Sequence, residues 1–181
     1  NSGAFHAKGE VHFKRKEYEE AIQSLREATR IQPHHRPSFE LMLEIFKATN
    51  NNYEARVIVR DMISRFGDRP PYYNELCRLY ALDGYLKEAV DICKEAIVKD
   101  SGKAENHVFL ASAYRDQEKF EMASSIYNRA GQRFLGSEFL QFSGGEYFAS
   151  RMNPSIAVGF FKRAVKADPK KARSQLGLAN S

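Results

Sequence analysis

The amino-acid sequence predicts an all-α protein built from tandem helix pairs, and three observations support that prediction. Alanine recurs every 34 residues with no gap or insertion, at Ala21, Ala55, Ala89, Ala123 and Ala157. Bulky side chains recur with the same period, at His12, Phe46, Tyr80, Tyr114 and Phe148. Prolines fall at the boundaries between periods, where a missing backbone N–H costs nothing, at Pro33, Pro70, Pro71 and Pro169.

The spacing inside one period indicates helices and not strands. Apolar residues recur every three or four positions through Ala123, Tyr127 and Ala130, which is the period of a helix face. Two alanines two turns apart allow neighbouring backbones to approach closely, and a ring such as Tyr114 fills the space beside them. Each period therefore contains two helices that pack through large and small side chains.

Turn and cap residues place the ends of these helices. The expected pairs, in chain order, are residues 3–15 and 18–31, 37–49 and 52–66, 71–83 and 86–99, 105–117 and 120–133, and 138–151 and 154–167. Gly84 ends the fifth helix as a left-handed residue, and Ser137 caps the ninth. Asn153 followed by Pro154 begins the tenth.

One repeat array is expected to cover residues 1–181. Its units are predicted at about 2–35, 36–69, 70–103, 104–137 and 138–171. Residues 172–181 are expected to begin the first helix of a sixth unit. That helix would leave Leu176 and Leu178 uncovered, so the natural protein is expected to continue.

These positions resemble the tetratricopeptide repeat, a family of 34-residue helix pairs. Unit one carries Phe5, Gly9, Tyr18, Ala21, Ala28 and Pro33, and unit five carries Phe148, Ala157, Phe161, Ala164 and Pro169. Unit two departs most, with Leu43, Met62 and Gly67 at motif positions. The resemblance covers residues 2 to about 171. It implies a right-handed α-solenoid, a superhelix whose first helices line a concave groove for a partner peptide or helix.

First-helix residues outside the packing positions are the groove candidates that the resemblance implies. They are His6, Glu10, Phe13, Glu40, Glu44, Asn74, Arg78, Val108, Ser112, Arg115, Phe142 and Glu146. This surface is expected to be acidic in the first two units, cationic near Arg78 and Arg115, and aromatic in unit five. His6, Glu10 and Leu41 replace the residues of the family's carboxylate clamp, which argues against binding of a chaperone tail.

No pattern of residues points to catalysis, and the sequence predicts no enzyme, no cofactor and no metal site. It contains neither a nucleophile-elbow motif nor a phosphate-binding loop. His12 and His107 occupy ring positions of the repeat, while His34 and His35 lie in a turn that is either solvated or a surface metal site. Cys77 and Cys93 are expected to be small buried packing residues, with a redox pair as the alternative.

The favoured function is a scaffold or adaptor that binds a protein or peptide segment in the groove. The net charge of +5 is spread among interspersed acids and bases, which argues against a nucleic-acid partner. An RNA-binding helical repeat and a self-assembling scaffold remain the alternatives. No apolar run approaches the roughly 18 residues of a membrane span. Two cysteines without a disulfide framework favour a cytoplasmic location.

Overall fold

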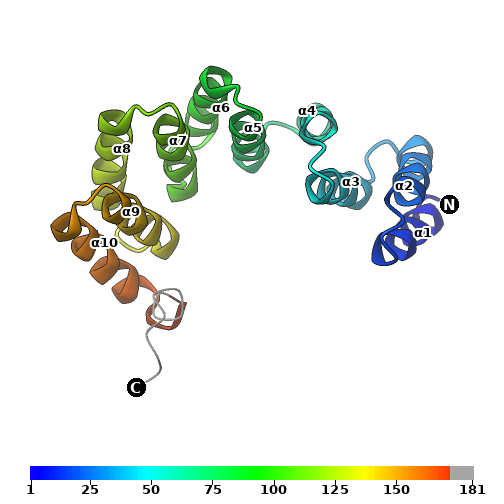
Figure 1. The fold of residues 1–181 in the computed structure, drawn as a ribbon. Coiled ribbons are helices and arrows are strands. Elements are labelled where there is room, and N and C mark those ends of the chain that lie inside the picture. Colours follow the sequence, from blue (N-terminus) through cyan, green and yellow to red (C-terminus); the bar gives the residue numbers. More distant parts are fainter. Residues whose placement is uncertain (172–181) are drawn as a thin grey trace. The chain divides into compact units, whose positions relative to one another are not determined.

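The computed structural model describes residues 1–171 of the chain (Figure 1). Residues 172–181, where the sixth unit is expected to begin, lie outside the described residues. In the described part, ten α-helices follow one another and no strand occurs. They are α1 (Ser2–Lys14), α2 (Tyr18–Ile31), α3 (Arg36–Ala48), α4 (Asn52–Phe66), α5 (Pro70–Leu82), α6 (Leu86–Lys99), α7 (Ala104–Asp116), α8 (Phe120–Arg133), α9 (Glu138–Ser150) and α10 (Pro154–Ala167). The prediction of an all-α chain of tandem helix pairs is confirmed.

The second helix of every pair has the bounds expected from the sequence, and the first helix differs by one residue. Helices α1, α3, α5 and α7 begin and end one residue earlier than expected, and α9 ends one residue earlier. Proline explains the start of α5, because Pro70 itself takes the first helical position, where its lacking N–H has no partner to lose. Ser137 caps α9 by accepting a hydrogen bond from the Leu140 amide at 3.3 Å.

A left-handed residue stands at the same place in the turn of every pair. Its φ angle is +62° at Lys16, +55° at Asn50, +79° at Gly84, +59° at Glu118 and +55° at Met152. The next amide then donates to the carbonyl of the ring position, as from Asn153 to Phe148 at 2.9 Å. This closure satisfies a carbonyl that the end of a helix leaves without a partner. The turns thus repeat every 34 residues even though only one of them uses glycine.

Replacing Met152 with glycine is expected to stabilise the protein by about 0.5–1 kcal/mol. A side chain in the left-handed region is strained, and Met152 is 92% exposed, so the substitution loses little packing. The measurement is urea unfolding followed by circular dichroism. Met152→Ala is the matched control, because alanine keeps the strain. Equal stability of the glycine and alanine variants would contradict the prediction.

The helices form two compact units, residues 1–85 and, within the described part of the chain, the residues from 86 onward. In the first unit, α1 packs on α2 and α3 on α4, while α2 and α4 contact the first helix of the following pair. The core here contains Leu25, Met42, Ile45 and Val59, each at most 2% exposed. Arg65 lies 5.4 Å above the ring of Phe39, and this ring meets Phe66 edge-on at 5.6 Å.

In the second unit, α7 packs on α8 and α9 on α10, with α6 against α7 and α8 against α9. Aromatic rings dominate its core: Tyr127 stacks on Tyr147 at 5.0 Å and Phe148 on Phe160 at 5.4 Å. The alanine positions of the repeat are closed to solvent in both units, with exposed fractions of 0% at Ala21, Ala55, Ala89 and Ala123 and 3% at Ala157.

Buried amides close the ends of two second helices in this unit. The Asn106 amide donates to the carbonyl of Ala96 at 3.0 Å, at the end of α6. The Gln141 amide donates to the carbonyl of Gly131 at 2.8 Å, at the end of α8. Both side chains sit on the following first helix, ten residues beyond the carbonyl. They therefore join one helix pair to the next through carbonyls that would otherwise lack a partner.

Candidate functional site

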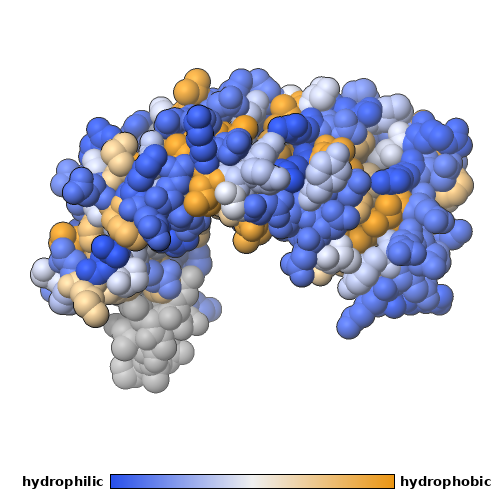
Figure 2. Space-filling view, turned by 45° about the horizontal axis from the view of Figure 1, so that its top comes forward, coloured by the Kyte–Doolittle hydropathy of each residue, from blue (hydrophilic) through white to orange (hydrophobic). Residues whose placement is uncertain are grey.

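First helices lie beside each other in both units and form the candidate surface. Helices α1 and α3 are in contact in the first unit, as are α7 and α9 in the second. Their packed sides face the second helices, which leaves one side of each first helix for other contacts. Hydrophilic side chains cover most of the molecular face seen in Figure 2, with hydrophobic ones scattered between them. Each unit's surface is described separately below.

Three carboxylates mark the surface of the first unit. Glu10, Glu40 and Glu44 are all exposed. Glu10 lies 3.7 Å from His6, whereas Glu40 and Glu44 have no ion pair with any residue in the described range 1–171. Because Glu40 and Glu44 are four residues apart on α3, they share one side of the helix. The acidic character expected here is therefore open to a ligand.

Two other candidates of the first unit, His6 and Phe13, contact neighbouring side chains within the protein. His6 Nδ1 lies 3.2 Å from Ser38 Oγ, which also contacts His35 Nδ1 at 2.8 Å. The ring of Phe13 is half-buried and lies 6.1 Å from that of Tyr18. His6 and Phe13 thus hold α1 to neighbouring segments more than they face solvent.

Arg78 is not an open cation. Its Nη2 and Nε donate to the two Glu75 carboxylate oxygens at 2.7 and 3.2 Å, and Lys47 Nζ lies 2.9 Å from the same carboxylate. Burial raises the pKa of Glu75, but hydrogen bonds and charge from Arg78 and Lys47 outweigh it, so the pKa lies below its usual value. The three groups are an internal ion cluster, and Arg78 contributes less positive charge to the surface than expected.

Two candidates are wrong as surface residues. Asn74 is 6% exposed and Val108 is 5% exposed, so neither side chain is available to a ligand. A first helix in the array packs on several sides, as α7 does against α6, α8 and α9. The solvent-exposed strip of such a helix is therefore narrower than that of an amphipathic helix with only one packed side. Residues next to the packing positions consequently become buried.

The surface of the second unit combines one arginine with aromatic rings. Arg115 is exposed and pairs with its neighbour Asp116 at 2.8 Å, a contact of little strength in water. Phe142 is half-buried against Phe161, with ring centroids 5.6 Å apart. Ser112 hydrogen-bonds to Tyr127, whose pKa is raised by burial.

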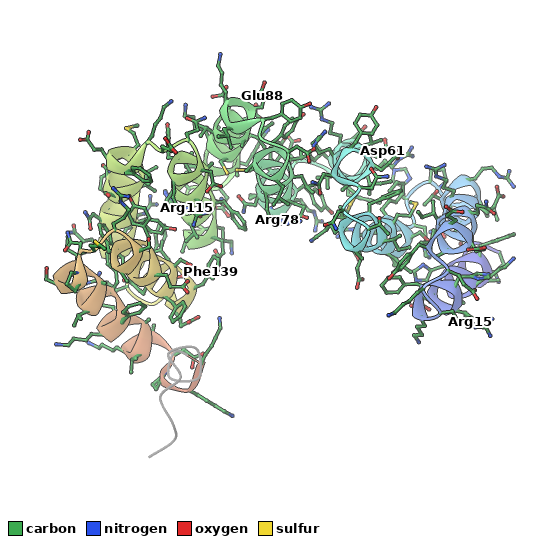
Figure 3. The ribbon with its side chains drawn as sticks, viewed as in Figure 1. Arg15, Asp61, Arg78, Glu88, Arg115 and Phe139 are labelled. Atoms are coloured by element: carbon green, nitrogen blue, oxygen red, sulfur yellow. The ribbon has the colours of Figure 1, made fainter. Side chains whose placement is uncertain are left out.

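Phe139 belongs to this surface and was missed in the sequence. Its ring is 39% exposed on α9, and Figure 3 shows it on the same side of the second unit as Arg115 of α7. Phe139, Phe142 and the exposed Glu146 are spaced by three and four residues, so they lie on one side of α9. That spacing was the signal available in the sequence.

The residues considered for chemistry serve the fold. His12 bonds Glu17 at 2.6 Å, and no cluster of three or more metal-binding side chains occurs in the described part. Cys77 and Cys93 are 2% and 0% exposed, as expected of packing residues. Both cysteines are also disulfide-bonded, which the expectation of two small buried packing residues did not include. Among the described helices, none combines the length and apolar character needed to cross a membrane.

The first helix pair matches a known family, and the whole fold resembles solved structures. Residues 2–35, the first helix pair, match the family model described as the tetratricopeptide repeat. The crystal structure of MamA protein has a TM-score of 0.68 at 15% identity, covering 99% of this chain and 97% of that one. The first helix pair is a tetratricopeptide repeat, and the chain has the fold of tetratricopeptide-repeat proteins.

Other tetratricopeptide-repeat structures show the same fold. TTC0263 from Thermus thermophilus, described as a thermophilic TPR protein, has a TM-score of 0.68 at 15% identity, with coverage of 97% of this chain and 96% of that one. YrrB, described as a TPR protein with an unusual peptide-binding site, has a TM-score of 0.59 at 12% identity, covering 93% and 87%. The comparison with curated proteins gave no match. At these identities the likeness establishes the fold.

Proposed function

We propose that this protein is a protein-interaction scaffold, and that the adjacent first helices of each unit bind an extended segment of a partner protein. One observation carries the proposal: the first helices present side chains that the packing of the array does not use. Exposed Glu40 and Glu44 supply negative charge in the first unit, and Arg115, Phe139 and Phe142 supply a cation and rings in the second. The peptide-binding site that YrrB's description reports is consistent with this role.

The two surfaces favour different peptide chemistry. The carboxylates of the first unit attract a Lys- or Arg-rich stretch, since complementary charge sets the specificity of polar interfaces. In the second unit, the exposed ring of Phe139 and the half-buried ring of Phe142, beside Arg115, suit a stretch with acidic and apolar or aromatic side chains. A cytoplasmic location, which the paucity of cysteines suggested, stays a prediction.

Reversing charge on α3 is expected to weaken binding of a basic peptide. The variant Glu40→Lys with Glu44→Lys removes two attractions and adds two repulsions, which corresponds to roughly a tenfold rise in Kd. The measurement is fluorescence anisotropy with a dye-labelled extended peptide of Lys, Arg and Ser. Glu88→Lys is the matched control, because Glu88 is exposed on the second helix α6 (Figure 3).

Two outcomes would overturn this assignment. If Glu88→Lys weakened peptide binding equally, the peptide would be responding to the overall charge of the protein and not to the α3 surface. Tighter binding of single-stranded RNA than of the peptide, lost about 10³-fold between 50 and 200 mM salt, would indicate a phosphate partner. Circular dichroism of each variant confirms that the fold is kept.

A further inference from the structure

A pocket of about 360 Å³ lies within the second unit, between α6, α7 and α8. Its apolar lining comes from Ile97, Leu110, Ile126 and Ala130. Ile97 and Ile126 are partly exposed, so apolar surface reaches solvent here. The volume falls in the range of about 300–1,000 Å³ that is typical of ligand pockets.

Two arginines place positive charge along one edge of this pocket. Arg129 and Arg133 line it one turn apart on α8, and both are exposed. Neither guanidinium has an ion pair with a carboxylate in the described part of the chain. Arg133 lies 5.0 Å above the ring of Phe134, which holds its guanidinium at the edge. The pocket thus offers two cations whose charge no described residue neutralises.

His107 completes the lining beside the arginines. Its Nε2 donates to the carbonyl of Ser101 at 3.3 Å, and its ring lies 5.3 Å from Phe134. Burial lowers the pKa of His107 although the Ser101 carbonyl opposes this, and the charges of Arg133 and Arg129 lower it further. The imidazole therefore feels the same positive field that a ligand anion would enter.

The next repeat shows the corresponding space filled. Thirty-four residues after Ile126 stands Phe160, which is 1% exposed. Its ring occupies the space above Gly131 and Gly144, the counterparts of Ile97 and Leu110. Arg163, the counterpart of Arg129, donates to Gln141 Oε1 at 2.8 Å. Both the apolar space and the arginine are thus engaged there.

The first unit also lacks this arrangement. Two repeats before His107 stands Phe39, a ring that is 3% exposed and fills its space. The counterpart of Arg129 is Asp61, whose Oδ2 lies 3.7 Å from Nε of Arg65, the counterpart of Arg133. Helix packing alone therefore leaves neither an open apolar space nor two unbalanced cations at this position of the repeat.

The pocket lies on a different side of α7 from the first-helix surface. At about 100° per residue, Leu110 projects roughly 140–160° away from Ser112 and Arg115 around the helix axis. A ligand in the pocket would leave the first-helix surface open.

We propose that this pocket binds an acidic peptide segment, which inserts an apolar side chain between Ile97, Leu110 and Ile126 and places carboxylates against Arg129 and Arg133. Charge complementarity selects the acid, since both cations lack a carboxylate partner in the described chain. The apolar lining favours a peptide with an apolar side chain, because a small inorganic anion would leave the apolar lining exposed to water.

An NMR titration of the full chain tests the proposal. The probe is the peptide Asp-Glu-Leu-Asp-Glu, and the expected result is shifts of the methyl resonances of Ile97, Leu110 and Ile126. Replacing the probe's leucine with serine is expected to remove these shifts. Arg129→Gln combined with Arg133→Gln is expected to raise the Kd about tenfold or more, because two charge-assisted contacts are lost.

Lys162→Gln is the control, since Lys162 is an exposed cation on α10, a helix that contributes no residue to the pocket lining. It is expected to leave the Kd of this probe unchanged within about twofold. Absent methyl shifts, equal binding of the serine peptide, or equal weakening by Lys162→Gln would each overturn the proposal. None of these results affects binding of a basic peptide to α3, so the two proposals fail separately.

Discussion

Replacing Phe160 with alanine is expected to lower the free energy of unfolding by about 3–5 kcal/mol. The ring is 1% exposed and stacks on Phe148 with centroids 5.4 Å apart. It also supports the Arg163 guanidinium, which lies 4.4 Å above it. Alanine would leave a cavity between α8, α9 and α10 that the two facing glycines, Gly131 and Gly144, cannot fill.

Urea unfolding measures this loss. Because the chain contains no tryptophan, far-ultraviolet circular dichroism is the suitable signal. Val158→Ala is the control on the same helix, since Val158 is 49% exposed and its truncation is expected to change stability by no more than about 0.5 kcal/mol. A similar loss for both variants would show that Phe160 does not hold the second unit together.

Replacing Gly144 with alanine is expected to destabilise the protein, although the helix propensities of the two residues favour alanine. Alanine is favoured over glycine in a helix by about 1 kcal/mol. At Gly144, however, an added Cβ would lie 2.5 Å from Cε1 and 2.6 Å from Cδ1 of Phe160, a buried ring with little room to move. Overpacking costs about 1–3 kcal/mol and the gain in helix propensity offsets about 1 kcal/mol of it, so a net loss of up to about 2 kcal/mol is expected.

Gly159 on α10 provides the matched control. An added Cβ there has its nearest contact at 3.6 Å, with Nη1 of the flexible Arg163 side chain. Gly159→Ala is therefore expected to stabilise by about 0.5–1 kcal/mol. The measurement is the same unfolding assay. A gain in stability at both positions would contradict the close fit between Gly144 and Phe160.

A double-mutant cycle locates the cause of the loss. Phe160→Leu removes Cε1 and Cζ, two of the three ring carbons that the new Cβ would meet, and leaves only a movable Cδ methyl group. Gly144→Ala should then cost less in that background than in the wild type, because residues in contact are not additive. An unchanged loss of stability on Gly144→Ala would show that the new Cβ clashes with a group other than the Phe160 ring.

The candidate surface was predicted in part from the sequence. Glu40 and Glu44 are exposed, as the repeat pattern indicated, because they stand on the side of α3 that no helix covers. Asn74 and Val108 are buried, and Arg78 is held by Glu75. Burial at such positions depends on how closely neighbouring helix pairs approach. That distance follows from side chains tens of residues away.

By itself, the sequence determined the period, the helices and their ends. A 34-residue recurrence of alanine and rings is a local pattern, and helix boundaries follow from caps, prolines and apolar spacing near them. It also placed the turn at Gly84, because glycine adopts a left-handed conformation readily.

Tertiary structure alone decided the left-handed turns at Lys16, Glu118 and Met152, where the closing hydrogen bond outweighs the strain of a side chain. It decided as well that Phe160 fills the last inter-helix space while the equivalent space beside Ile126 stays open. The physical reason is packing: whether a space between three helices is full depends on the combined volumes of side chains from all three, which no single stretch of sequence contains.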